Sequence, residues 1–132
     1  MNTGDPITDL LNRLRNALRA GHTRVDVPAS RVREGLLKVL AEEGYIGSYR
    51  RVEEKGRPLL RVALKYDAEG QSVVAGLERV SRPGRRVYSR SQEIPDVLDG
   101  LGDSIISTSE GITTGRKARE SRLGGEILFN VW

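Results

Sequence analysis

The chain lacks cysteine altogether, and only 5% of its residues are aromatic. Without cysteine it can form neither a disulfide framework nor a thiolate zinc site. No apolar run reaches the length of about 18 residues that a membrane-spanning helix needs, and the first ten residues lack the basic start and apolar run of a signal peptide. We therefore expect a cytoplasmic protein in a reducing environment, with no membrane partner.

The usual catalytic motifs are also missing. The single histidine, His22, lies in an arginine-flanked turn, and neither Ser107 nor Ser109 sits in a GxSxG motif. A phosphate-binding GxxxxGK[ST] loop is absent, and the paired acids Glu42 and Glu43 are typical of a helix surface. The three aspartates Asp96, Asp99 and Asp103 do not have the spacing of a calcium-binding loop. We expect no enzyme activity, no metal, no cofactor and no small-molecule substrate.

Positive charge is plentiful and is carried mainly by arginine. The chain has 132 residues, a net charge of +4 and a pI near 9.8, and eighteen of its twenty-two cationic side chains are arginine. The planar guanidinium suits phosphates and base edges, so the composition favours an anionic partner. The length allows one domain or two very small ones, and 37% hydrophobic residues supply a modest core without a large pocket.

The first half of the chain predicts a helix, a strand and a second helix. Apolar residues at helical spacing follow Asp5 and Pro6 up to residue 20, and a second helical pattern follows Ser30 up to residue 43. A short strand over 25–27 lies between them. Two more strands are expected over 45–52 and 59–66, separated by the polar turn EEKGRP.

The polar segment DAEG predicts a boundary between two parts. We expect an N-terminal α/β subdomain over 1–66, a linker over 67–71 and a β-rich subdomain over 72–132. The fold class is then α+β, built from two small α/β subdomains. In the second part the patterns predict a hairpin of 72–81 with 85–89, a helical turn over 94–101, a strand over 104–109, a short basic helix after Thr114 and a final strand over 126–132.

Three consecutive hydroxyl residues are the most informative feature of this second part. Ser107, Thr108 and Ser109 each carry a short side chain that donates and accepts hydrogen bonds. Glycines close by in sequence allow a backbone or a nucleobase to approach: Gly111, Gly124 and Gly125. Taken alone, an STS triplet also fits an ordinary strand end followed by a polar turn.

Two basic stretches add to this feature. Residues 79–91 hold five arginines, including Arg85 and Arg86, with no acid, and Tyr88 among them offers an aromatic face for RNA bases. Tyr88 also fits a half-buried strand position. Residues 13–33 hold six arginines, which is typical of a solvated helix surface, although Ser30 and Arg31 stand at a helix start that favours phosphate.

The order of several motifs resembles the bacterial small-subunit ribosomal protein eight family. The motifs are DPITDLLNRLRNA, VDVPASR, LKVLAEEGYI, LKY, RVSRPGRRVY and, near the end, STSEG, KAR and GGEIL before a final aromatic strand. They span nearly the whole chain. Four residues depart from the family pattern. Near the STSEG motif, Glu110 replaces a lysine, Thr113 a methionine and Gly115 an acid. At the second helix, Arg31 replaces a lysine.

The resemblance implies a protein that binds the central domain of small-subunit rRNA, assists its assembly and contacts neighbouring ribosomal proteins. In some bacteria the family also represses its own operon by binding the messenger RNA. The implied RNA-contacting residues are Ser107, Thr108, Ser109, Gly111, Tyr88, Gly124, Gly125 and Glu126, with Asp5, Ser30 and Arg31 from the first half. From its own chemistry, Glu126 is better suited to hold an arginine and organise the hydroxyl loop, because phosphate repels a carboxylate. Phe129 and Trp132 are expected in the core.

Two other functions fit the composition. A DNA-binding regulator would need the first two helices to form a helix-turn-helix, but the segment 21–29 is too long and strand-like for that turn. A basic protein-interaction module for acidic partners is the other alternative.

Overall fold

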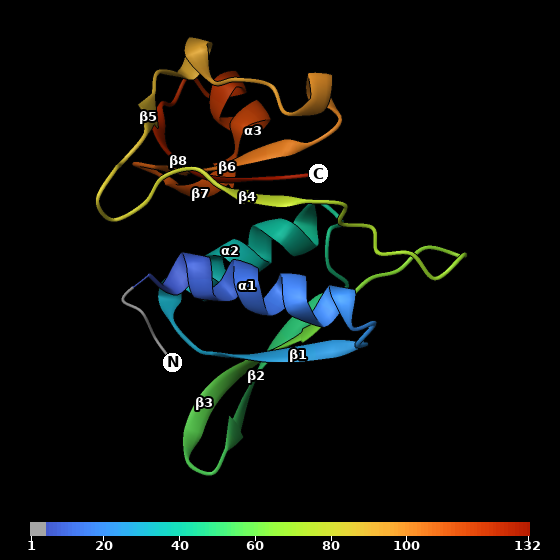
Figure 1. Ribbon diagram of the computed structural model, residues 1–132. Helices are drawn as coiled ribbons and strands as arrows, with labels where there is room; N and C mark the ends of the chain where they lie inside the picture. Colours follow the sequence, from blue (N-terminus) through green and yellow to red (C-terminus); the bar gives the residue numbers. More distant parts are fainter. Residues whose placement is uncertain (1–4) are drawn as a thin grey trace. The chain divides into compact units, whose positions relative to one another are not determined.

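The computed structural model describes residues 5–132. The chain divides into an N-terminal unit, Met1–Val73, and a C-terminal unit, Val74–Trp132. Each combines helices with antiparallel strands, which confirms the α+β class (Figure 1). The segment expected to be a linker forms a turn in which Asp67 donates its N–H to the Gln71 carbonyl oxygen at 2.7 Å. The subdomain bounds given above stay a prediction.

Two helices and a small antiparallel sheet make up the N-terminal unit. Its elements are α1 (Pro6–Arg19), β1 (Arg24–Pro28), α2 (Arg31–Glu42), β2 (Ser48–Glu54) and β3 (Arg57–Ala63), with the strands in the order β1-β3-β2. Both predicted caps are present. Asp5 accepts from the Thr8 N–H at 3.2 Å, and Ser30 accepts from the Arg33 N–H at 3.1 Å. Each cap satisfies a helix N–H group that has no partner within its helix.

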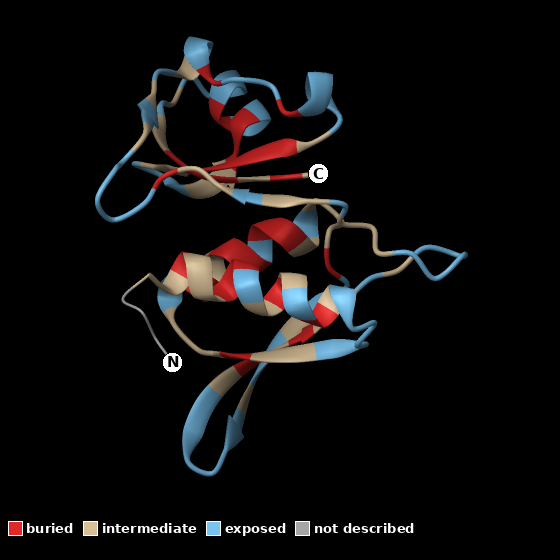
Figure 2. Ribbon diagram, viewed as in Figure 1, coloured by how far each residue is buried: buried red, intermediate tan, exposed pale blue. Residues whose placement is uncertain are grey.

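One face of this sheet is buried and the other is open. Leu60 and Val62 of β3 and Val27 of β1 are fully buried, because α1 and α2 pack against the sheet on that side (Figures 1 and 2). Alternation along the strands turns the residues between them, such as Leu59 and Arg61, toward the other face. The helices bury leucines at i, i+3 and i+4 spacing: Leu10, Leu11, Leu14, Leu36, Leu37 and Leu40.

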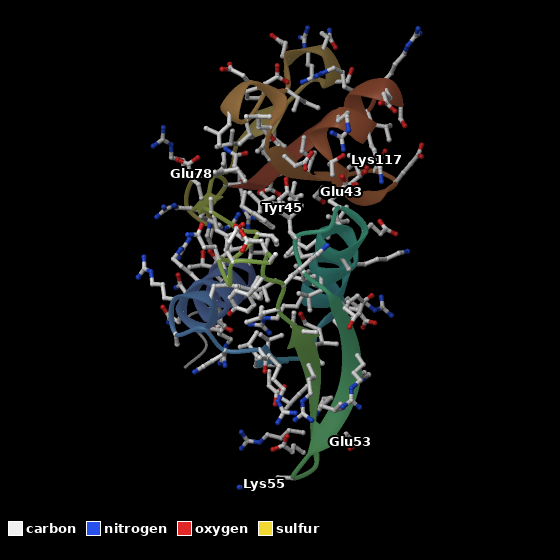
Figure 3. All side chains as sticks on the ribbon, turned by 90° about the vertical axis from the view of Figure 1, so that its right-hand side faces the viewer. Glu43, Tyr45, Glu53, Lys55, Glu78 and Lys117 are labelled. Carbon is white, nitrogen blue, oxygen red and sulfur yellow. The ribbon has the colours of Figure 1, made fainter. Side chains whose placement is uncertain are left out.

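The β2–β3 hairpin has the predicted pair of strands, but both lie closer to the turn than predicted, at Ser48–Glu54 and Arg57–Ala63 instead of 45–52 and 59–66. Its strands continue through most of the EEKGRP segment, and only Lys55 and Gly56 form the turn. Both have left-handed φ values, 53° and 76°, as a two-residue turn of the primed type requires. The charged residues of the segment remain exposed while they pair, so hydropathy did not mark them as strand. Figure 3 shows Glu53 and Lys55 at this end of the hairpin.

The C-terminal unit is a five-stranded antiparallel sheet with one short α-helix. Its elements are β4 (Leu77–Arg79), β5 (Tyr88–Ser89), the 3-10 turns Ser91–Glu93 and Leu98–Gly100, β6 (Asp103–Thr108), β7 (Gly111–Thr114), α3 (Gly115–Glu120) and β8 (Gly125–Val131). The strand order is β4-β8-β6-β7, with β5 also paired to β8. The strand β7 was not predicted, because its four residues lie between a tight turn and a helix cap.

The predicted hairpin of 72–81 with 85–89 is wrong. The strands β4 and β5 do not pair with each other; both pair with β8, so that residues 77–89 run along β8 as an interrupted strand. Arg82 and Arg85 exchange two backbone hydrogen bonds, of 3.0 and 2.9 Å, around Pro83 and Gly84. Residues 82–86, the arginine loop, therefore form a small insertion between two strand segments. The turn residues Pro83 and Gly84 are as predicted, but the partner strand β8 lies 36 to 54 residues away in sequence and leaves no local signal.

The expected helical turn over 94–101 is present only as a 3-10 turn at Leu98–Gly100, and Ile94 and Val97 are extended. The short 3-10 turns lie at 91–93 and 98–100, and left-handed φ values at Leu98 and Asp99, 48° and 54°, prevent a regular helix. Ile94 is buried with Ile106, Ala118 and Ile127, which form the core beneath α3. Phe129 is fully buried, as expected, whereas Trp132 is half-buried.

Candidate RNA-binding site

The hydroxyl residues lie at the end of β6, where a two-residue turn leads into β7. The hydroxyl of Thr108 donates to the Gly111 carbonyl oxygen at 2.7 Å and accepts from the Glu110 N–H at 3.1 Å. Gly111 has a φ of 113°, a conformation that favours glycine. Thr108 and Gly111 therefore fix the turn that carries Ser109 and Glu110.

Strand pairing places the predicted residues in two adjacent rows. Tyr88, Glu126 and Ser107 are directly opposite one another on β5, β8 and β6. The next row holds Ser89, Gly125 and Thr108. Paired residues of an antiparallel sheet share a face, and successive residues alternate.

Ser107 and Thr108 consequently point to opposite faces, and the hydroxyl triplet does not act as one group. Ser107 shares the face of Tyr88. Thr108 shares the face of Ile106, which packs against α3. Among residues 5–132, no group hydrogen-bonds the side-chain hydroxyls of Ser107 and Ser109. These two hydroxyls are available to a ligand, whereas Thr108 holds the turn.

The two glycines at the start of β8, Gly124 just before it and Gly125 as its first residue, allow neighbouring backbones to approach closely. A Cβ atom on Gly124 would lie 2.6 Å from the Ser89 carbonyl oxygen, and one on Gly125 would overlap the carbonyl oxygen of Ser107. Real Cβ atoms essentially never come so close to backbone atoms. The close approach expected from the GG pair is therefore made by the protein's own strands β5 and β6.

Glu126 holds the arginine loop in place. Its carboxylate accepts hydrogen bonds from the hydroxyl of Ser81 and from the Arg86 guanidinium, the latter at 3.1 Å. The same Ser81 hydroxyl accepts from the Val87 N–H at 3.0 Å, so one network closes both ends of the loop. Ser81 is fully buried. This network ties the loop to the row that holds Tyr88 and Ser107.

The surface beside this row is cationic and includes an aromatic ring. Tyr88 is 70% exposed, and Arg82 and Arg85 are exposed at the end of the loop. An open hollow of about 850 Å³ runs past Tyr88 and is also lined by Arg122 and by Arg90, which pairs with Glu93 of the same lining at 3.9 Å. The arrangement offers a face for stacking, free hydroxyls and several guanidinium groups within one region of the sheet.

The N-terminal residues Asp5, Ser30 and Arg31 lie at two helix starts. The Asp5 and Ser30 side chains cap α1 and α2, and Arg31 is exposed at the first position of α2. Arg33 brings these starts together, because its guanidinium donates to the carbonyl oxygens of Pro6 and Pro28, at 3.2 and 3.3 Å.

Sequence reasoning missed the role of Arg33. It is only 4% exposed and pairs with Asp9 at 3.2 Å. The available signal was its helical spacing to buried leucines, since Arg33, Leu36, Leu37 and Leu40 share one face of α2.

Neither a metal site nor a membrane helix is found in the part of the chain that the structure describes. Residues 5–132 contain no group of three or more His, Cys, Asp or Glu side chains that could hold a metal ion. No helix within that range is both long and apolar enough to cross a membrane.

Comparison with known proteins gives a consistent result. The family model "Ribosomal protein S8" matches residues 5–132. Proteins named "Small ribosomal subunit protein uS8" from Treponema pallidum (strain Nichols) and Clostridioides difficile are 52% and 48% identical, each over the full length of both chains. The protein of the same name from Koribacter versatilis is 50% identical over 98% of both chains. The chain therefore belongs to the ribosomal protein S8 family.

Proposed function

We propose that this chain is a structural component of the small ribosomal subunit that binds the central domain of its rRNA directly and assists the assembly of that region. The similarity to small-subunit proteins along the entire chain supports the place in the subunit. A structural role in the ribosome is not enzymatic, which agrees with the missing catalytic motifs.

The row of Tyr88, Glu126 and Ser107 is the observation that supports RNA binding most directly. It places the 70% exposed ring of Tyr88 and the free hydroxyl of Ser107 on one face, and Glu126 in the same row anchors the arginine loop through Arg86. Irregular RNA helices are recognised through stacking on splayed bases and hydrogen bonds to 2′-hydroxyls, while arginines neutralise phosphates. The site offers each of these interactions.

The free hydroxyls of Ser107 and Ser109 indicate which part of the site contacts RNA. The hydroxyls of Ser107 and Ser109 can still donate and accept hydrogen bonds, whereas the Thr108 hydroxyl already bonds to Gly111 and Glu110 in the turn. Glu110 is exposed at the same turn and repels phosphate. We therefore place the phosphate backbone on the Tyr88 and arginine side and only base or ribose groups at the turn.

The N-terminal unit contributes a second contact at the start of α2. Arg31 is exposed there, and the helix N-terminus favours phosphate. Asp5 and Ser30 act through the helix caps that position this end. The messenger RNA of the protein's own operon would be a further ligand if it contains a stem of the same shape, since the site recognises shape.

The alternative of a DNA-binding regulator has no structural basis in the helix pair. The strand β1 separates α1 from α2, so that these helices do not form a helix-turn-helix. The following experiment distinguishes RNA from an acidic protein as the partner.

The test is a titration of the full chain with an rRNA central-domain fragment, a scrambled stem, duplex DNA and an acidic peptide at several salt concentrations. We expect the cognate fragment to bind most tightly. Thr108→Ala should weaken cognate binding by about 1–3 kcal/mol and reduce discrimination, while Arg85→Ala should lower the salt slope by about 1. Thr108→Ser, which keeps the hydroxyl, is the matched control. Equal affinity for the cognate and scrambled stems would contradict the proposal.

A further inference from the structure

The uncovered face of the N-terminal sheet has an ordered arrangement of charges. The residues that point outward form the open sheet face: Arg24, Asp26 and Pro28 on β1, Ser48, Arg50, Val52 and Glu54 on β2, and Arg57, Leu59, Arg61 and Ala63 on β3. The strand register aligns Asp26, Arg61 and Arg50 in one row and Pro28, Leu59 and Val52 in the next. An apolar row thus lies directly beside a charged row.

Both acids on this face are occupied by a single arginine. The Arg61 guanidinium binds Asp26 with two hydrogen bonds, each of 2.9 Å, and Glu54 with a third of 2.8 Å. Arg61 is 19% exposed and central in the sheet, so this arrangement is held by the strands on both sides. The carboxylates are therefore not available to neutralise the other cations of the face.

The other three arginines have no carboxylate partner. Within residues 5–132, Arg24, Arg50 and Arg57 form no ion pair, and all three are exposed. Arg24 and Arg50 nevertheless act on Asp26: its pKa is lowered mainly by the hydrogen bonds from Arg61 and further by the charges of these two arginines. The face therefore has an excess of positive charge.

The spacing of these arginines suits an extended anion. Arg24 and Arg50 lie two strands apart, and Arg50 and Arg57 are separated by one strand and two rows. Strand separation is about 4.8 Å and outward residues recur about every 6.7 Å, so the backbone positions of neighbouring arginines are about 10 Å or more apart. They would contact separate phosphates rather than enclose one ion.

We propose that the open sheet face is a second RNA-binding surface, in which Arg24, Arg50 and Arg57 contact phosphates and the row of Pro28, Leu59 and Val52 packs against ribose. This inference rests on the proposed function in taking RNA as the anion. It goes beyond that function because the face includes neither the hydroxyl turn nor the start of α2. Phosphate contacts would make this surface insensitive to RNA sequence.

The test compares two double variants that lose the same charge. Arg50→Gln/Arg57→Gln removes two arginines of the open sheet face, and Arg19→Gln/Lys38→Gln removes two exposed cations from α1 and α2. Binding is measured against the cognate rRNA fragment, a scrambled RNA stem and polyglutamate over a range of salt concentrations. Both variants keep the Asp26–Arg61 pair and should therefore fold. Thermal unfolding checks that they do.

We expect the Arg50/Arg57 variant to reduce the salt slope by about 2 for both RNAs, and additional Arg24→Gln to reduce it by about 1 more, with the control near wild type. Equal slopes for the Arg50/Arg57 and Arg19/Lys38 variants would overturn the inference, as would a loss confined to polyglutamate. Equal affinity of the wild-type chain for the cognate and the scrambled RNA would refute the proposed function alone. A wild-type chain that binds neither RNA would refute both.

Discussion

The Arg86 guanidinium donates a hydrogen bond to the Glu126 carboxylate at 3.1 Å, and this bond connects the arginine loop to the strand β8. Because Glu126 also accepts from the buried Ser81, its two interactions can be separated by substitution. The geometry of the arginine loop therefore depends on an acidic residue that acts without contacting RNA.

Glu126→Ala should destabilise the protein by about 1–3 kcal/mol, since it leaves the buried Ser81 hydroxyl without its acceptor. Glu126→Gln keeps an acceptor for Ser81 and removes the charge that holds Arg86, so its stability should stay closer to wild type while RNA affinity falls. Urea denaturation and RNA titration of both variants provide the measurements. If the glutamine variant bound RNA more tightly, Glu126 would act mainly by repelling phosphate.

Gly124→Ala should displace β5 from β8. Its Cβ atom would meet the Ser89 carbonyl oxygen at 2.6 Å and the Arg90 Cα at 3.1 Å, and neither backbone atom can move without moving the strand. We expect a loss of about 1–3 kcal/mol in stability, together with weaker RNA binding because Tyr88 lies on β5. Gly84→Ala is the control, since nothing lies within 4 Å of its added Cβ. Equal melting temperatures for the two variants would disprove this steric account.

Arg33→Met should lower the free energy of unfolding by about 1–3 kcal/mol, because the Pro6 and Pro28 carbonyl oxygens lose their donor while Asp9 keeps its ion pair with Arg13 at 2.9 Å. Arg31→Met changes an exposed arginine two residues earlier and should alter stability by less than about 0.5 kcal/mol. Denaturant unfolding at neutral pH compares the two directly. A large loss in the Arg31 variant with none in the Arg33 variant would reverse our assignment of structural and RNA-facing arginines.

Acid should weaken the N-terminal unit through Asp26. Hydrogen bonding from Arg61 lowers the pKa of Asp26 from 3.8, and the same pairing raises the pKa of Arg61. A lowered folded-state pKa means that the contribution to stability is fully present above 3.8 and is lost as the pH falls through the folded-state value. Asp26→Asn should therefore be less stable than wild type at pH 6, with the difference shrinking near pH 2. Unfolding curves at both pH values are the check, and a constant difference would contradict this linkage.

The sequence predicted those parts of the fold that depend on neighbouring residues. Asp5 and Ser30 identify helix starts because a cap acts over three residues, and the apolar spacing of α1 predicts its buried face directly. The partner of β4 and β5 could not be predicted, because the register with β8 is set by contacts between distant segments. The three strands of the N-terminal unit were anticipated, although the charged ends of β2 and β3 were not.

The candidate site was predicted as a set of residues but not as an arrangement. Ser107, Tyr88 and Glu126 do lie in one row, which motif order alone did not specify. Strand alternation separates Ser107 from Thr108, although three adjacent hydroxyl residues look alike in the sequence. The role of Arg33 is not evident from the sequence, because a basic residue in a basic segment is typical of a solvated helix surface.

The most direct test of the central claim uses the absence of native cysteine. A hydroxyl-radical probe is attached to Ser109→Cys at the turn and, separately, to Leu101→Cys, which is an exposed position elsewhere in the same unit. Each labelled chain is bound to full-length small-subunit rRNA. We predict that the probe at residue 109 cleaves a short, defined segment of the central domain, and that the probe at residue 101 does not cleave that segment. Cleavage of the same positions by both probes, or none from residue 109 in a chain that still binds, would contradict RNA docking at this turn.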